Sequence, residues 1–125
     1  MHHRAAVSTI VLVAGVLVGC VTENRPATCN ADKTTIELTV SASALTPNDP
    51  AACRGQIVTM TLDPEVNGVF HIHGLDTVVP ATPIRSGEPV TLEFTADRSG
   101  QFPIELHLAD DPTGLSLGIF TVYER

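Results

Sequence analysis

VFHIHGLD, residues 69–76, is the stretch of the sequence that decides the fold. Apolar and polar side chains alternate along it, with Phe70 and Ile72 on one side and His71 and His73 on the other. A period of two is typical of a β-strand that has one buried face. The stretch therefore predicts a strand that presents two histidines on its polar face.

A second stretch, GQFPIELH at residues 100–107, alternates in the same way. Its large apolar residues share one face, and Glu105 and His107 share the other. If the two strands are neighbours, three imidazoles and a carboxylate meet on one patch, the only concentration of coordinating side chains in the sequence. Pro103 lies inside the second strand and indicates an edge position or a bulge.

The rest of the chain predicts short strands that are separated by Pro- and Gly-containing loops. The other expected strands are Thr34–Ala42, Gln56–Leu62, Val90–Ala96 and Leu117–Tyr123. Loops are expected at Leu45–Ala52 and Asp110–Gly114, and the turn at residues 97–100 is expected to close a hairpin. No apolar helical stripe follows residue 20. The sequence therefore predicts an all-β fold, an antiparallel Greek-key β-sandwich.

The first 19 residues have the layout of a secretory signal peptide, with Arg4 followed by an apolar run from Ala5 to Gly19. The ending Leu17-Val18-Gly19-Cys20 resembles a bacterial lipobox, in which cleavage precedes the cysteine and its thiol carries a diacylglycerol. The alternative is a cleaved signal peptide with an incidental cysteine. We expect an exported protein of the cell envelope, on the extracytoplasmic side, held to a membrane by a lipid on Cys20. Residues 20–33 are polar and are expected to form a tether, and residues 34–125 the domain.

The two remaining cysteines, Cys29 and Cys53, form an even pair in an oxidising compartment, where a disulfide is the default. The alternative is a pair of thiolate metal ligands, but no CxxC spacing and no nearby histidine support it.

The charge balance argues against polyanionic partners. After the leader the chain has 14 acidic and six basic residues, a formal charge of −8 with histidines neutral. Such a chain repels nucleic acid and anionic lipid headgroups, and it is compatible with cations and basic proteins. The length suits one domain with a two-layer core.

The order of these parts resembles the cupredoxin fold, over about residues 34 to 124. The matching pieces are His71 and His73 on a middle strand, Phe94–Phe102 in the form F-x-A-x-x-x-G-x-F, the loop Leu106–Ser116, and Gly118–Val122 in the form G-x-h-x-V. The resemblance is closest to cupredoxin-like domains of bacterial envelope proteins that share HxHG and FxIExH. Compared with the copper domain of cytochrome oxidase subunit II, His73 followed by Gly74 is the better match for the first copper histidine.

The sequence departs from this family at the ligands of type 1 copper, which are a Cys thiolate, two His and usually a weak Met. The family has its cysteine where this chain has Leu106, no Cys follows Cys53, and no Met follows Met60. A blue-copper electron carrier and a dinuclear site with two cysteines are therefore excluded. What the resemblance leaves is a nitrogen and oxygen site for Cu(II), Zn(II) or Ni(II). Its candidate ligands are His73 and His107 first, His71 as a third, and Glu105 or Asp76 as supplementary oxygens.

Two functions remain open on this basis. The first is a lipid-anchored cupredoxin-like protein that binds copper or another divalent metal through histidines and acts in envelope metal handling rather than electron transfer. The second is a metal-free binding or interaction module at the envelope, whose histidines are structural or solvated. An enzyme is not expected, because the sequence has no nucleophile constellation and no phosphate loop. The sequence indicates no partner protein.

Overall fold

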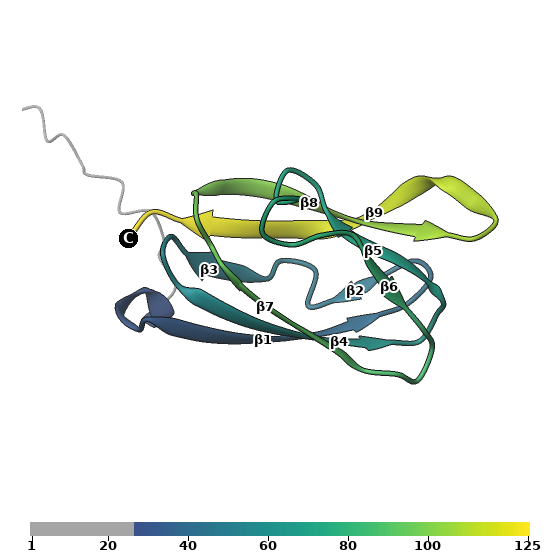
Figure 1. Cartoon of the computed structure of the whole chain (residues 1–125), viewed down its shortest axis with the longest axis horizontal. Helices are drawn as coiled ribbons and strands as arrows, with labels where there is room; N and C mark the ends of the chain where they lie inside the picture. The colour runs from purple at the N-terminus through teal and green to yellow at the C-terminus, as the bar shows by residue number, and fades with distance from the viewer. Residues whose placement is uncertain (1–26) are drawn as a thin grey trace, which may run out of the picture.

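Two β-sheets packed face to face form the body of the protein (Figure 1). The computed structural model describes residues 27–125, apart from the side chains of residues 27, 28 and 112. Its elements are η1 (a 3-10 helix, Ala27–Asn30), β1 (Lys33–Val40), β2 (Leu45–Thr46), β3 (Ala51–Cys53), β4 (Ile57–Pro64), β5 (Gly68–Ile72), β6 (Thr82–Ile84), β7 (Val90–Thr95), β8 (Gly100–Leu108) and β9 (Asp111–Tyr123).

The expected signal peptide, residues 1–19, and the expected lipidation site, Cys20, lie outside the described residues. Within residues 27–125, no helix has the length and apolar character needed to cross a membrane.

The two sheets are mixed. The four-stranded sheet has the order β2-β1-β4-β7, and the five-stranded sheet has the order β3-β9-β8-β5-β6. Most neighbouring strands are antiparallel, but β1 runs parallel to β4 and β3 runs parallel to β9. The chain reaches β4 from β1 by way of β3 in the other sheet, and this crossover makes the parallel pair. The expected all-β sandwich is confirmed, with mixed rather than purely antiparallel sheets.

Strands with a clear alternation lie close to their expected bounds. β8 extends one residue beyond the expected stretch, to Leu108, and β1, β4 and β7 differ from their expected ranges by at most two residues at either end. The two expected loops are partly strand, because Leu45–Ala52 contains β2 and most of β3, and β9 begins at Asp111. Both β2 and β3 are two- or three-residue edge strands, formed by pairing with a neighbour rather than by a pattern of their own.

The expected hairpin between β7 and β8 is wrong. β7 pairs with β4 in the four-stranded sheet, whereas β8 pairs with β5 and β9 in the five-stranded sheet. Residues 96–99 therefore carry the chain from one layer to the other. Ala96 donates its N–H to the carbonyl of Gln56 at 2.9 Å, which holds the end of β7 on its own sheet. A turn signal between two alternating segments does not specify which sheet each segment joins.

Pro103 lies in a central strand rather than at an edge, so the edge interpretation is wrong. A register shift between β8 and β9 follows one residue later, between Ile104 and Glu105. The carbonyl of Pro103 accepts the N–H of His73 at 2.8 Å, one residue past Ile72, where β5 ends. In an antiparallel pair, the N–H and C=O of one residue face the same neighbouring strand, so Pro103 faces β5. Its missing N–H therefore lies at the end of the β5–β8 ladder, where it removes no hydrogen bond from within that ladder.

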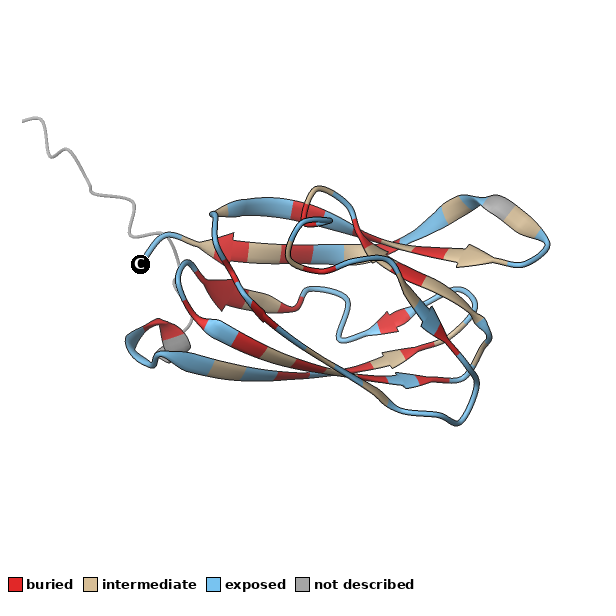
Figure 2. Cartoon of the chain, viewed as in Figure 1, coloured by how far each residue is buried: buried red, intermediate tan, exposed pale blue. Residues whose placement is uncertain are grey.

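The core lies between the sheets and is filled by the inward side chains of both. Buried and more exposed residues alternate along β1 and β4 (Figure 2). Phe94 of one sheet meets Phe120 of the other edge-to-face, with ring centroids 6.0 Å apart. In β5 and β8, the even-numbered residues Phe70, Ile72, Ile104 and Leu106 are fully buried. The odd-numbered residues of these two strands are therefore presented on the outer face of the five-stranded sheet.

The expected disulfide between Cys29 and Cys53 is confirmed and attaches η1 to β3. The buried side chain of Gln56 reinforces this attachment, since it accepts the N–H of Cys53 and donates to the carbonyl of Ala31, both at 2.8 Å. The folded part of the chain therefore begins before the expected boundary at residue 34.

Removing this disulfide with Cys29→Ser and Cys53→Ser together is expected to lower the free energy of unfolding by about 3 kcal/mol, because the bridge closes a loop of 24 residues in the unfolded chain. Urea unfolding followed by circular dichroism measures the change. Reduction of the wild type should lower the midpoint to that of the variant, and reduction of the variant should have no effect. An unchanged midpoint in the variant contradicts the prediction.

Candidate metal centre

The ladder between β5 and β8 builds the candidate site. His71 lies directly opposite Glu105, and Val69 lies directly opposite His107. Residues opposite each other in an antiparallel pair point to the same face. All four side chains therefore lie on the outer face of the five-stranded sheet, and the two stretches are neighbours, which is the condition for their polar side chains to meet.

His73 reaches the same patch by a turn and not by strand alternation. The strand expected over residues 69–76 ends at Ile72, and Gly74 takes a positive φ of 89° in the turn that follows. The hydrogen bond from His73 N–H to Pro103 anchors the start of the turn on β8. As a result the His73 ring lies edge-on to the His71 ring, with centroids 5.7 Å apart.

Three side chains converge closely enough to share a cation. His71, His73 and Glu105 each offer one ligand atom, and these atoms lie within 4.8 Å of one another. Metal bonds of about 2.0–2.1 Å span at most about 4.2 Å between two ligand atoms. The distance of 3.8 Å from His71 Nδ1 to Glu105 Oε2 already lies within that limit. The ligand atoms that are farthest apart, at up to 4.8 Å, must therefore approach each other by at most about 0.6 Å. A rotamer change of His73, which is exposed and lies on a turn, can supply this movement.

Asp76 orients His71. The Nε2 atom of His71 forms a hydrogen bond to a carboxylate oxygen of Asp76, and because a carboxylate only accepts, Nε2 is the donor. The lone pair of a neutral His71 ring is then on Nδ1, the nitrogen that faces Glu105. Carboxylates that hold a ligating histidine through its other nitrogen are a common feature of metal sites. Asp76, expected as a supplementary ligand, thus lies behind His71 rather than beside Glu105.

The same hydrogen bond lowers the pKa of the Asp76 carboxyl below its ordinary value of 3.8. A carboxyl with a lowered pKa stabilises the fold above its unfolded pKa, and this contribution is lost as the pH falls through the lower folded value. We expect His71→Ala to raise the pKa of Asp76 towards 3.8, as measured by carboxyl NMR titration. Asp111, whose pKa is lowered by hydrogen bonds from Thr113, is the internal control and should not move. An Asp76 titration unchanged by the substitution contradicts the prediction.

His107 lies at the margin of this group. Its Nε2 is 3.6 Å from Glu105 Oε2, and its ring centroid is 6.0 Å from that of His71. Among the described residues, the side chains that meet within 4.8 Å do not include it. The structure therefore favours His71 over His107 as the partner of His73, the reverse of the order expected from the sequence.

Gly114, which sequence reasoning missed, positions His107. A Cβ atom at Gly114 would lie 2.8 Å from Cε1 of the His107 ring, so the ring packs directly on the β9 backbone. Gly114 also has a positive φ of 75°. The only sequence signal was a Thr-Gly pair in an expected loop, and nothing in it points to a histidine.

No protein-family model and no curated protein matches the chain. Several solved structures do match the chain. A blue copper oxidase from Nitrosomonas europaea matches with a TM-score of 0.58 at 17% identity, over 74% of this chain and 39% of that one. A copper-binding protein solved in its apo form by NMR gives 0.57 at 14% identity, over 73% and 88%. Auracyanin from the photosynthetic bacterium Roseiflexus castenholzii gives 0.54 at 21% identity, over 71% and 96%.

The chain has a cupredoxin-like fold. It spans about two fifths or less of the first multicopper oxidase structures that it matches. At identities of 14 to 21%, these matches establish the fold and leave the function to the residues of the site.

The type 1 copper ligands do not fit this cupredoxin-like chain. Leu106, which the sequence resemblance aligns with the family's thiolate, is fully buried and faces the core. Cys29 and Cys53 are bonded to each other. The nitrogen and oxygen donors of the outer face do fit a divalent transition-metal ion, because imidazole and carboxylate together suit Cu(II), Zn(II) and Ni(II).

Proposed function

We propose that this protein binds a divalent transition-metal ion, with Cu(II) first, through His71, His73 and Glu105. The observation that carries the proposal is the convergence of these three donors within 4.8 Å on one face of the sheet. The hydrogen bond between His71 and Asp76 supports it, because this bond leaves a ring nitrogen of His71 directed at Glu105.

Copper is favoured by two considerations. Sites of nitrogen and oxygen donors generally bind Cu(II) more tightly than the other divalent ions of the first transition row. The solved structures with the same fold include proteins named for copper, although that likeness alone shows only the fold.

The donor set favours metal handling over electron transfer or catalysis. Type 1 electron carriers depend on a thiolate ligand, and this site has none. Three protein ligands on an outer sheet face leave coordination positions open to solvent or to a partner's donor, which suits an ion that is bound and passed on. We propose that the protein does this outside the cytoplasm, at the cell envelope, held to a membrane by a lipid on Cys20, and without enzymatic activity.

The test is a Cu(II) titration of the chain from Val21 onward, purified without a histidine tag. Starting at Val21 removes the Cys20 thiol and the histidines at positions 2 and 3, which would bind copper themselves, so that His71, His73 and His107 are the histidines present. We expect one ion per chain by isothermal titration, with weak visible absorption and no intense thiolate band. Undetectable binding at micromolar concentrations would overturn the proposal.

A metal-free interaction module is the second candidate, and the pocket beside His107 favours it. The two candidates differ in their response to metal. A ligand at 100 times its Kd stabilises a folded protein by about 2.7 kcal/mol, so a copper-binding protein should melt several degrees higher with Cu(II). An unchanged melting temperature supports the metal-free module.

A further inference from the structure

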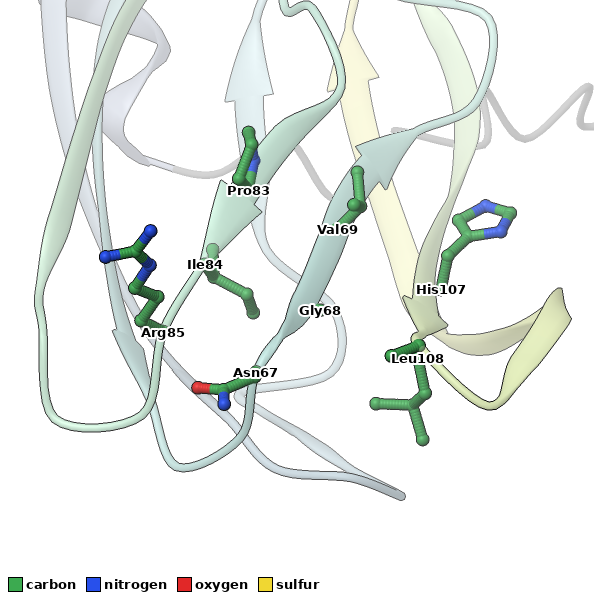
Figure 3. A pocket seen from close by; sticks show the side chains of 9 residues that line it. Asn67, Gly68, Val69, Pro83, Ile84, Arg85, His107 and Leu108 are labelled. Carbon is green, nitrogen blue, oxygen red and sulfur yellow. The ribbon is translucent and has the colours of Figure 1, made fainter.

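A pocket of about 530 Å³ lies on the five-stranded sheet where β5, β6 and the end of β8 meet. Figure 3 shows Asn67 and Arg85 on one side of it, His107 and Leu108 on the other, and Val69 and Pro83 beyond them. Its volume lies within the range of about 300–1,000 Å³ that is usual for small-molecule sites. The pocket is adjacent to the candidate metal centre, since His107, which lines it, lies opposite Val69 and two residues from Glu105 on the same face.

One side of the pocket offers hydrogen-bond donors without bound partners. The guanidinium of Arg85 forms no hydrogen bond and no ion pair within residues 27–125. The carbonyl oxygen of the Asn67 side chain accepts the N–H of Ser86 at 2.9 Å, which fixes the amide and leaves its NH₂ group as a donor. Arg85 and Asn67 line the same pocket, and guanidinium and amide donors suit a carboxylate.

Apart from the imidazole of His107, the rest of the pocket is apolar. Val69 and Leu108 are partly buried, and Pro83 adds a rigid apolar surface. No Asp or Glu lines the pocket, although the whole chain has a formal charge of −7. The charge that faces a ligand here is therefore positive, opposite in sign to that of the protein as a whole.

We infer that this pocket binds a small amphipathic carboxylate, with its head at Arg85 and Asn67 and its aliphatic body over Val69, Pro83 and Leu108. The inference does not depend on metal binding, because no ligand atom of His71, His73 or Glu105 takes part in it. Its test can therefore be carried out in the presence of EDTA, so its outcome is separate from that of the metal proposal.

The experiment is an NMR titration of the ¹⁵N-labelled chain from Val21 onward with decanoate, below its micelle concentration. We expect saturable shifts of the amides around Val69 and Leu108. Decyltrimethylammonium, which has the same chain length and the opposite charge, should bind at least about tenfold more weakly, the difference expected for one charge-assisted hydrogen bond. Equal binding of the two amphiphiles, or decanoate shifts confined to other strands, would overturn the inference.

Two variants test the two parts of the pocket separately. Arg85→Gln should weaken decanoate binding about tenfold or more. Its matched control is Arg98→Gln, because Arg98 lies over the Phe102 ring, 5.6 Å from the centroid, and does not line the pocket. Val69→Phe narrows the apolar part and should also weaken binding. If decanoate binds the Arg85 variant as tightly as the Arg98 variant, the carboxylate does not bind at Arg85 and the inference fails.

Discussion

His71→Ala is expected to lower the affinity for Cu(II) by at least about 100-fold. Loss of a residue that only orients a metal ligand typically costs 10- to 100-fold, so loss of the ligand itself costs at least as much. His71 is the residue on which the rest of the site depends: it lies opposite Glu105 in the ladder, its ring adjoins that of His73, and Asp76 holds it. Isothermal titration of the chain from Val21 onward measures the loss.

His107→Ala is the matched control, because it removes an imidazole from the same face and leaves the three converging side chains in place. We expect it to change the affinity by less than about tenfold. Melting temperatures of both metal-free variants show whether each remains folded. If His107→Ala loses as much affinity as His71→Ala, the ion binds near the contact between His107 and Glu105, and the assignment of the ligands is wrong.

The sequence was sufficient to predict the outward face of the candidate site. Alternation along residues 100–107 predicted all but the last residue of β8, and alternation of Phe70 and Ile72 with the histidines put His71 on the polar face. Both patterns are local, and both follow from the same physical cause, the burial of every second side chain.

The sequence was not sufficient to predict which histidines are the better candidate ligands. Counting by twos extends the strand through His73 and makes His71 and His73 neighbours about 6–7 Å apart along it. The structure instead turns after Ile72, and the turn brings the His73 ring back towards His71. That turn depends on Gly74 and on a hydrogen bond to Pro103, a residue some 30 positions away. Such a contact exists only once β5 and β8 are paired.

The sequence patterns also could not predict which strands pair with each other. The turn signal between β7 and β8 suggested a hairpin, yet these strands belong to different sheets. Both strands present apolar side chains to the same core, so either arrangement satisfies the alternation. What decides between them is the pairing of β7 with β4 and of β8 with β9, which joins segments far apart in the chain.

Gly118→Ala is expected to lower the free energy of unfolding by about 4 kcal/mol. A Cβ atom at Gly118 would lie 2.2 Å from the backbone oxygen of Asn48 and 3.0 Å from its carbonyl carbon. That backbone cannot yield as a side-chain end would, because the Asn48 oxygen accepts the N–H of Ile119 and the Pro50 oxygen accepts the N–H of Thr121, both at 3.0 Å. The added methyl group thus forces overpacking and breaks hydrogen bonds between this loop and β9.

Ser116→Ala is the control for this prediction, since Ser116 is exposed in the same strand and should change the stability by no more than about 0.5 kcal/mol. Urea unfolding of both variants gives the comparison. The G-x-h-x-V pattern at residues 118–122 then has a physical meaning here: its glycine is the place where the loop before β3 lies on β9. Equal stability of the Gly118 and Ser116 variants would show that this close approach does not hold the two segments together.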